Sequence, residues 1–143
     1  LEWARGYAAG REPDFVIGER QLERWWVIPR NKLFNIYLHR FNDSDEDRAL
    51  HDHPWVSLGW ILGPGGYNDQ GITRIHWKHA GSLTWRWPTT AHRVVLSGDR
   101  PVYTLFFTGP VVREWGFLCP KGWGHWKDFV SVVPGGKKIG RGG

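Results

Sequence analysis

The sequence has very little cysteine and no long run of hydrophobic residues. Its single cysteine, Cys119, cannot form an internal disulfide, which excludes a small secreted domain held together by disulfide bonds and predicts a cytoplasmic protein. No apolar stretch approaches the roughly 20 residues that a helix needs to cross a bilayer. With 41% hydrophobic and 23% charged residues, the composition predicts a soluble protein with no membrane partner.

Tryptophan, glycine and proline are abundant instead. The chain of 143 residues contains 11 tryptophans, 19 glycines and 9 prolines, and its aromatic share of 15% is too high for a disordered chain. Glycine and proline interrupt helices and mark turns, so their number argues against a helical bundle. A chain of this length fits one compact domain. The composition therefore predicts a single aromatic-rich β domain.

Strand-like segments follow one another along most of the chain. They are FNIYLHRF (34–41), VSLGWIL (56–62), SLTWRW (82–87), HRVVL (92–96), VYTLFF (102–107) and FVSVV (129–133). Turn-forming clusters such as GPGGYNDQG (63–71) separate them. Short strands at this spacing, without intervening helices, predict an all-β fold of the antiparallel barrel or jelly-roll type.

The two ends of the chain differ from this central region. Residues 1–30 are predicted to form a helical extension that packs on the barrel, with an apolar stripe in and before GERQLERWW. The stripe residues are Phe15, Leu22, Trp25 and Trp26. Residues 31–134 form the predicted barrel, and residues 135–143 form a flexible basic tail. The net charge of +5 is partly due to this tail and is too modest to predict nucleic acid as a partner.

Three of the seven histidines are spaced as a metal site requires. His51 and His53 in LHDHPW are two residues apart, so on a strand both side chains leave the same face. His92 begins a strand whose Val94 and Leu96 share its face, which directs His92 to the interior. Imidazole nitrogens bind divalent metals such as Fe, Zn, Ni, Cu and Mn. These three histidines are the candidate metal ligands.

The same segments resemble the cupin superfamily. GSLTWRWPTTAH (81–92) resembles the second cupin motif, and LHDHPW (50–55) resembles the start of the first. The resemblance implies a small cupin, a double-stranded β-helix that holds a metal inside the barrel through the three histidines. The usual cupin glutamate falls on Ser57 or Leu58, and neither side chain replaces a carboxylate. The implied site is therefore a three-histidine site, as in the thiol dioxygenases.

Within the cupins, the cysteine dioxygenase family offers the closest resemblance. RNKLFNIYL followed by LHDH, and HRVVLSGDRPVYTLFFTGP, look like that family's conserved segments and together extend over roughly residues 30–110. The resemblance implies that the three histidines bind iron(II). It also implies that Arg30 holds the carboxylate of the substrate.

The chain departs from this family on the strand after the third ligand. The family's Ser-His-Tyr triad falls on Thr104, Phe106 and Thr108, so only the first hydroxyl is kept. The cysteine that some members cross-link to the tyrosine falls on Leu58. Loss of the His and the Tyr removes the polar wall expected beside the bound thiol and oxygen, which argues against L-cysteine as the substrate.

Further residues are candidates for binding the substrate. Arg40 lies on an apolar strand face, where an arginine needs an anionic partner, either the substrate or a nearby aspartate. Tyr37 and Tyr103 each offer a phenol, although both also suit ordinary strand positions. The substrate-binding candidates are therefore Arg30, Arg40, Tyr37, Tyr103 and Thr104. His39 is expected to be a hydrogen-bonded residue at the edge of the core.

Most tryptophans are expected to pack the core rather than to bind a ligand. Trp85 and Trp87 alternate in SLTWRW, so they share a face and are predicted to pack against the barrel wall or the N-terminal helix. The positions predicted to surround the metal are apolar: Trp55, Leu58, Trp60 and Phe106. If they line the pocket, the substrate should be bulkier or more apolar than cysteine.

Together these patterns predict a mononuclear non-haem iron(II) cupin that uses dioxygen to oxidise a small substrate, a carboxylate-bearing thiol or a related compound. The alternative is a non-catalytic cupin that binds a metal or a small ligand, with which the missing glutamate and the incomplete triad are compatible. An acid–base isomerase is a weaker hypothesis, because no carboxylate lies on the histidine-bearing strands. Since cupins often pair, a homodimer is also expected.

Overall fold

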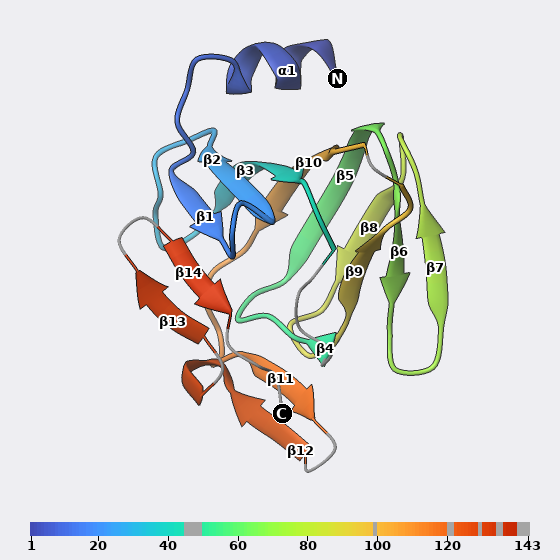
Figure 1. Ribbon diagram of the computed structural model, residues 1–143. Coiled ribbons are helices and arrows are strands. Elements are labelled where there is room, and N and C mark those ends of the chain that lie inside the picture. The colour runs from blue at the N-terminus through green and yellow to red at the C-terminus, as the bar shows by residue number, and fades with distance from the viewer. Residues whose placement is uncertain (45–49, 99, 120–121, 129, 134–135, 140–143) are drawn as a thin grey trace.

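The main element of the computed structural model is an eight-stranded sheet in the order β13-β14-β1-β2-β3-β10-β5-β8 (Figure 1). All neighbouring strands are antiparallel except β1 and β14, which run parallel. The strands are β1 (Phe15–Ile17), β2 (Leu22–Trp26), β3 (Asn35–Phe41), β5 (Ser57–Pro64), β8 (Leu83–Arg86), β10 (Val102–Thr108), β13 (Val130–Val133) and β14 (Gly136–Ile139). The structure describes residues 1–44, 50–98, 100–119, 122–128, 130–133 and 136–139.

Two smaller sheets complete the fold. The first has the order β7-β6-β9 and contains β6 (Tyr67–Gln70), β7 (Ile75–Lys78) and β9 (Arg93–Leu96). The second has the order β12-β11-β4 and contains β4 (Leu50–His51), β11 (Gly116–Cys119) and β12 (Gly122–His125). A helix, α1 (Glu2–Ala8), begins the described chain, and a short 3-10 helix, η1 (Trp126–Asp128), follows β12. Among the described residues, no helix is long and apolar enough to cross a membrane.

Side chains alternate across the strands of the main sheet and thereby form two cores. The inner face contributes to a cluster that contains Ile61, Tyr67, Val94 and Val102. On the outer face, α1 places two buried alanines against Trp25, Leu38 and Tyr103. Successive residues of a strand point to opposite faces, so neighbouring positions belong to different cores. The inner face also lines the cavity that contains the candidate site.

The predicted N-terminal helix is in the wrong place. The helix lies at Glu2–Ala8, whereas Phe15 belongs to β1, and Leu22, Trp25 and Trp26 belong to β2. β2 forms antiparallel ladders with β1 on one side and β3 on the other. The apolar residues therefore serve two sheet faces rather than one helical stripe.

Two segments predicted to be irregular form strands. The glycine-rich cluster at 63–71 contains β6, which pairs with both β7 and β9. In the predicted flexible tail, Gly136–Ile139 forms β14 and pairs with β1. Residues 135 and 140–143 of that tail lie outside the described part of the chain.

Candidate metal centre

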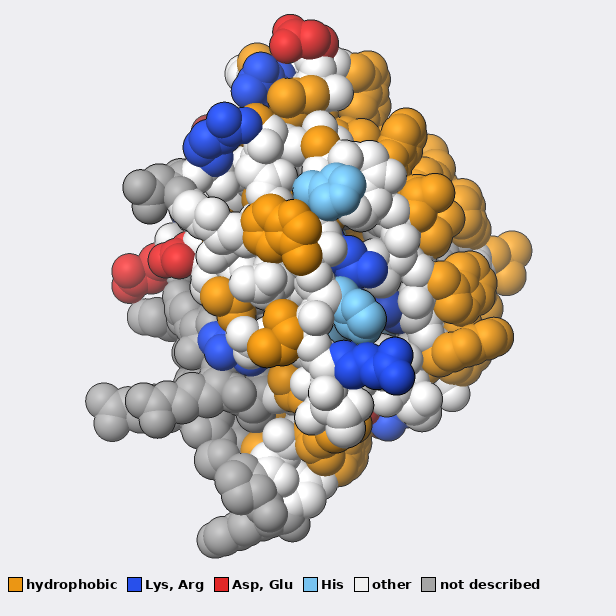
Figure 2. Space-filling view, turned by 90° about the vertical axis from the view of Figure 1, so that its right-hand side faces the viewer, with side chains coloured by type: hydrophobic (Ala, Val, Ile, Leu, Met, Phe, Trp, Pro, Cys, Tyr) orange, Lys and Arg blue, Asp and Glu red, His pale blue; other side chains and the backbone are white. Residues whose placement is uncertain are grey.

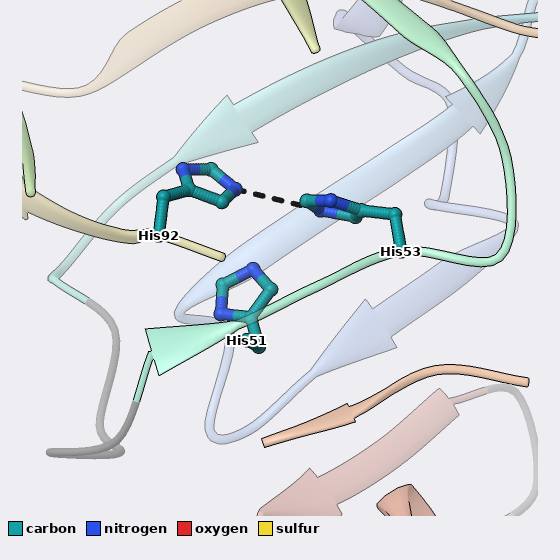
Figure 3. A group of neighbouring side chains, drawn as sticks. All are labelled: His51, His53 and His92. Atoms are coloured by element: carbon teal, nitrogen blue, oxygen red, sulfur yellow. Dashed lines mark hydrogen bonds between the residues drawn. The ribbon is translucent and has the colours of Figure 1, made fainter. Parts of the chain in front are cut away.

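Three histidines from two neighbouring segments point toward one another inside the barrel (Figure 3). His51 ends β4 and forms an isolated antiparallel bridge with His92, in which each backbone N–H donates to the other residue's carbonyl at 2.8 and 2.9 Å. His53 follows two residues later, and its backbone N–H donates to the carbonyl of Pro88 at 3.0 Å. Backbone hydrogen bonds thus hold all three residues in place, and the three histidines form the cluster that the sequence pattern predicts.

The nitrogen atoms of the three rings are close enough to share one ion. One ligand nitrogen from each ring lies within 4.8 Å of the other two. Nε2 of His53 and Nε2 of His92 are 3.4 Å apart. Two imidazole nitrogens bound to one ion at about 2.1 Å are roughly 3.0 to 3.4 Å apart when the angle at the metal is between octahedral and tetrahedral. The donor set and this spacing fit a divalent first-row metal.

A buried carboxylate orients His92. Oδ1 of Asp69, on β6, lies 2.6 Å from Nδ1 of His92, and Oδ2 of the same carboxylate is paired with Arg86 on β8. The carboxylate accepts the proton of Nδ1, so we assign the tautomer that leaves a lone pair on Nε2, the atom that faces the other histidines. A carboxylate bonded to the outer nitrogen of a histidine is the usual support of a metal ligand.

Burial keeps two of the ligands neutral. It lowers the pKa of His92 to about 3, and the charge of Arg86 acts in the same direction against the hydrogen bond with Asp69. Burial, followed by the neighbouring histidines, also lowers the pKa of His53 well below its usual value. Only a neutral imidazole has a lone pair for a metal. Both residues are therefore available as ligands at neutral pH.

The residue between His51 and His53 points away from their ligand atoms. Asp52 accepts hydrogen bonds from the backbone N–H of Gly116 at 2.8 Å and from Nε1 of Trp123 at 3.0 Å, and it forms an ion pair with Arg113 at 2.9 Å. The first two contacts attach the ligand segment to β11 and β12, and the third attaches it to the segment before β11. The alternation expected for His-Asp-His is confirmed.

A cavity of about 300 Å³ opens beside the three histidines. Three of the five substrate-binding candidates line it: Arg30, Tyr37 and Thr104. Thr104 is 2% exposed, and its Oγ1 has no hydrogen-bond partner among the described residues. His39 also lines the cavity and accepts a hydrogen bond from Nε of Arg24 at 2.8 Å, which confirms the bonded role expected for it.

The other two candidates, Arg40 and Tyr103, do not line the cavity. Nε of Arg40 donates to the buried carboxylate of Glu23 at 3.0 Å, and Nη1 donates to the Tyr103 hydroxyl at 3.4 Å. Both residues alternate with the inward-facing His39 and Thr104, so they lie on the outer face of the sheet. The anionic partner that Arg40 requires is therefore Glu23 of the same chain rather than a ligand.

The tryptophans are divided between the two faces in the same way. Trp55 lines the cavity, where it stacks on His53 with a ring separation of 5.1 Å. Phe106 lies beside it, whereas Leu58 and Trp60 do not line the cavity and lie on the opposite face of β5. The predicted packing of Trp85 and Trp87 against the wall or the helix is wrong, because these side chains are 55% and 61% exposed.

Sequence reasoning missed three residues that surround the histidines. Asp69 was hidden in a segment that reads as a turn, and Arg24 in a segment that reads as a helix. Arg86 could have been found, because alternation in SLTWRW must direct it to the face opposite Trp85 and Trp87. An arginine that points to a barrel interior needs a buried polar or anionic partner, which for Arg86 is Asp69.

Comparison with known proteins finds similarity in structure and not in sequence. No protein-family model matches the chain, and no curated protein matches it. A cupin-2 domain from Rhodospirillum rubrum is 10% identical, covers 71% of this chain and 68% of its own, and has a TM-score of 0.59. The described strands and this match decide the fold. The chain forms a small cupin barrel.

Two further solved structures are similar to this chain in fold. A cupin 2 conserved barrel domain protein from Rhodopseudomonas palustris is 13% identical, with 71% of this chain and 69% of that chain covered and a TM-score of 0.58. A DMSP lyase from Ruegeria pomeroyi is 14% identical, with 63% and 47% covered and a TM-score of 0.53. At such low identity the shared feature is the fold, so the expectation of thiol dioxygenase chemistry stays a prediction.

Proposed function

We propose that this cupin is an oxidoreductase in which His51, His53 and His92 hold iron(II), and that it uses dioxygen to oxidise a small carboxylate-bearing substrate. The observation that carries the proposal is the cluster of three converging imidazoles, with His92 oriented by a buried Asp69. When bound, iron(II) would supply open coordination positions for dioxygen and for an anionic group of the substrate.

The chain's own residues would bind and enclose the substrate. Trp55 and Phe106, whose ring centres are 5.4 Å apart, form an apolar wall next to His53. Thr104 offers an unpartnered hydroxyl from the same inner face of the sheet. The apolar wall displaces water and favours a substrate with a larger apolar part than cysteine has, while the hydroxyl can donate one hydrogen bond to it.

Metal analysis tests the first part of the proposal. Protein purified without oxygen is expected to contain about one transition-metal ion per chain, and His92→Ala should reduce this content at least tenfold. His79→Ala is the matched control, because His79 follows β7, is exposed, has its ring against the backbone carbonyl of Ala80 and does not line the cavity. No bound metal in the wild-type protein, or full metal content in His92→Ala, would refute the metal site.

Oxygen consumption tests the second part. The iron(II)-loaded protein should consume dioxygen in the presence of thiols that carry a carboxylate, and more slowly with the corresponding neutral amides. Thiol-dependent oxygen uptake that is the same in wild type and in His92→Ala would refute catalysis at this site.

The alternative is a cupin that binds a small ligand without turnover. One observation favours it over acid–base catalysis: Asp52 is the only carboxylate among the described residues that line the cavity, and three hydrogen-bonding or ionic contacts already occupy it. A general base needs a free carboxylate or an equivalent group within reach of the substrate. Tight binding of the carboxylate-bearing compounds without oxygen uptake would support this alternative.

A further inference from the structure

Arg24 is a cation that lines the cavity and has no anionic partner in the part of the chain that the structure describes. It lies on β2, opposite Phe15 of β1 and His39 of β3, and all three residues line the cavity. Nε of Arg24 donates to Nε2 of His39 at 2.8 Å. Among the described residues, no carboxylate pairs with Arg24, and no acceptor takes a hydrogen bond from either of its two Nη atoms.

The surroundings hold the guanidinium in one position. The ring of Tyr37 lies 4.6 Å from its central carbon, and the ring of Phe15 lies 5.4 Å away. Burial, opposed by Tyr37 and assisted by the charge of Arg30, lowers the pKa of Arg24 to about 10. The residue is thus still positively charged at neutral pH. A desolvated guanidinium with free Nη groups is in the state that binds a planar anion most strongly.

The charge balance of the cavity also favours an anion. Three arginines line it: Arg24, Arg30 and Arg86. Arg86 is neutralised by Asp69, and the only lining carboxylate among the described residues, Asp52, pairs with Arg113. Counted over the described residues, the two uncompensated cations of the cavity are therefore Arg24 and Arg30. The electrostatic effect of Arg24 also reaches His53, where it contributes to lowering the pKa of that ligand.

We propose that Arg24, positioned by His39, binds the carboxylate of the ligand through its two Nη atoms, and that an apolar or aromatic group of the ligand fills the adjoining cavity. This inference deepens the proposed function, because it names the residue that selects the carboxylate. The hydrogen bonds between Arg24 and the ligand carboxylate require no bound metal. Arg30, which is exposed and lies over the ring of Trp26 at 5.5 Å, would attract the anion at the mouth of the cavity.

Calorimetry with benzoate and its neutral isostere benzamide tests the assignment. With protein as purified and again after chelator treatment, the wild type should bind benzoate at least tenfold more tightly than benzamide. Arg24→Gln should remove this preference, leave benzamide binding within twofold, and retain the wild-type metal content. Arg5→Gln is the charge-matched control, because Arg5 lies on α1 at the surface.

Several results would overturn the assignment. These are equal affinity of the wild-type protein for the two probes, an undiminished preference in Arg24→Gln, and a complete loss of the preference in Arg30→Gln alone. If Arg24→Gln does not fold, Arg24→Lys keeps the charge without the planar fork and should lower benzoate affinity by about fivefold or more. Because binding is measured with and without metal, failure of the iron site and failure of the anion site are distinguishable.

A separate observation concerns the outer face of the main sheet. Leu58 and Trp60 of β5 are cross-strand neighbours of Trp85 and Leu83 of β8, and Trp87 packs edge-on against Trp85 at 5.6 Å. We call these five residues the β5–β8 patch. Four of them are exposed by 42% to 63%, and Figure 2 shows hydrophobic side chains gathered along one side of the molecule. Helix α1 covers the neighbouring part of this face but not the patch.

The β5–β8 patch is large enough for two copies of the chain to associate through it, and it includes an uncovered edge strand of the sheet. Aromatic side chains present about 150 to 250 Å² each, so the exposed parts of the patch amount to roughly 400 to 500 Å². A stable interface buries about 800 Å² per partner, of which about 60% is apolar. β8 is also an end strand of its sheet, and among the described strands it pairs only with β5. An uncovered edge strand is a ready site for pairing with another chain.

We infer that two copies of this chain associate through the β5–β8 patch. Sedimentation velocity should give twice the chain mass at 100 µM, and Trp85→Glu should shift the protein to monomer. Trp77→Glu is the control, because Trp77 lies on β7, outside the patch, and is 54% exposed. A monomeric wild type at 100 µM, or a dimer that persists in Trp85→Glu, would overturn the inference. Far-UV circular dichroism establishes that both variants are folded.

Discussion

His92 uses both nitrogens of its ring, and each makes a different contribution. Nδ1 is bonded to Asp69, whereas Nε2 faces His53 at 3.4 Å. The first contact fixes the ring and its tautomer, and the second leaves a lone pair where a metal would bind. Because Arg86 in turn neutralises Asp69, two buried side chains in succession support one ligand.

Replacing Asp69 tests this support. Asp69→Asn keeps the volume but removes the charge that orients His92, so metal affinity should fall about 10- to 100-fold, the usual effect of losing such a contact. Competition with a chromophoric chelator measures the affinity. Asp14→Asn is the control, because the Asp14 carboxylate accepts a hydrogen bond from the backbone N–H of Trp26 and does not line the cavity. Unchanged affinity in Asp69→Asn would mean that the carboxylate does not position the ligand.

Glu23 provides a pH-dependent contribution to stability. Burial alone would raise the pKa of its carboxyl, but hydrogen bonds from Arg40 and Asn42 and the nearby arginine charges lower it below the usual 4.5. A carboxyl whose pKa is lower in the folded than in the unfolded state stabilises the folded state at pH values above the unfolded pKa. This stabilisation is lost as the pH falls through the lower pKa of the folded state.

The variant Glu23→Gln should therefore be less stable than the wild type by about 1 to 3 kcal/mol at pH 7. The difference should shrink as the pH falls below about 4.5. Urea unfolding at a series of pH values measures it, and Glu12→Gln, whose side chain is 90% exposed, should change stability by less than about 0.5 kcal/mol. A difference that does not vary with pH would contradict the account.

At the scale of elements, two strands show why neighbouring residues have different roles. In β2, Arg24 lines the cavity while Trp25 packs under α1. In β8, the buried Arg86 alternates with outward-facing tryptophans. A strand covered on both faces, such as β2, has apolar residues on both. Because the apolar residues of β2 do not alternate strictly with polar ones, its sequence pattern also fits a helix.

Gly116, on β11, should not tolerate a side chain. A Cβ at this position would overlap the carbonyl oxygen of Gly124 and lie 2.9 Å from the ring of Trp123. Gly116→Ala should destabilise the protein by about 2 to 3 kcal/mol and weaken the contact of Asp52 with this hairpin. Gly6→Ala is the matched control, because a Cβ there meets nothing within 4 Å and alanine favours a helix by up to about 1 kcal/mol. Equal stability of the two variants in chemical denaturation would contradict this prediction.

At the scale of the whole molecule, the candidate site links several parts of the barrel. The ligands lie on or beside β4 and β9, Asp69 lies on β6, and Arg86 lies on β8. These elements belong to all three sheets. A metal at the histidines would therefore stabilise the folded chain as a unit, since the unfolded chain does not present the three rings together.

Metal binding should consequently raise the midpoint of thermal unfolding. At a free metal concentration 100 times the Kd, linkage contributes about 2.7 kcal/mol, which for a chain of this size corresponds to roughly 5 to 10 °C. Differential scanning calorimetry with iron(II) or zinc, compared with a chelator-treated sample, measures the shift. His92→Ala should abolish it, whereas a shift that persists in this variant would locate the stabilising ion elsewhere.

The sequence by itself determined the fold class, the three histidines and the apolar character of Trp55 and Phe106. These features depend on short-range spacing, because two-residue alternation and turn clusters act within one strand and its connections. Tertiary structure decided which of the arginines enters the cavity. Arg24, Arg30 and Arg40 occur within 17 residues of one another. Glu23 neutralises Arg40, while no carboxylate of the described residues pairs with Arg24. The partner of a charge is set by which strands become neighbours, and that depends on pairing between distant segments.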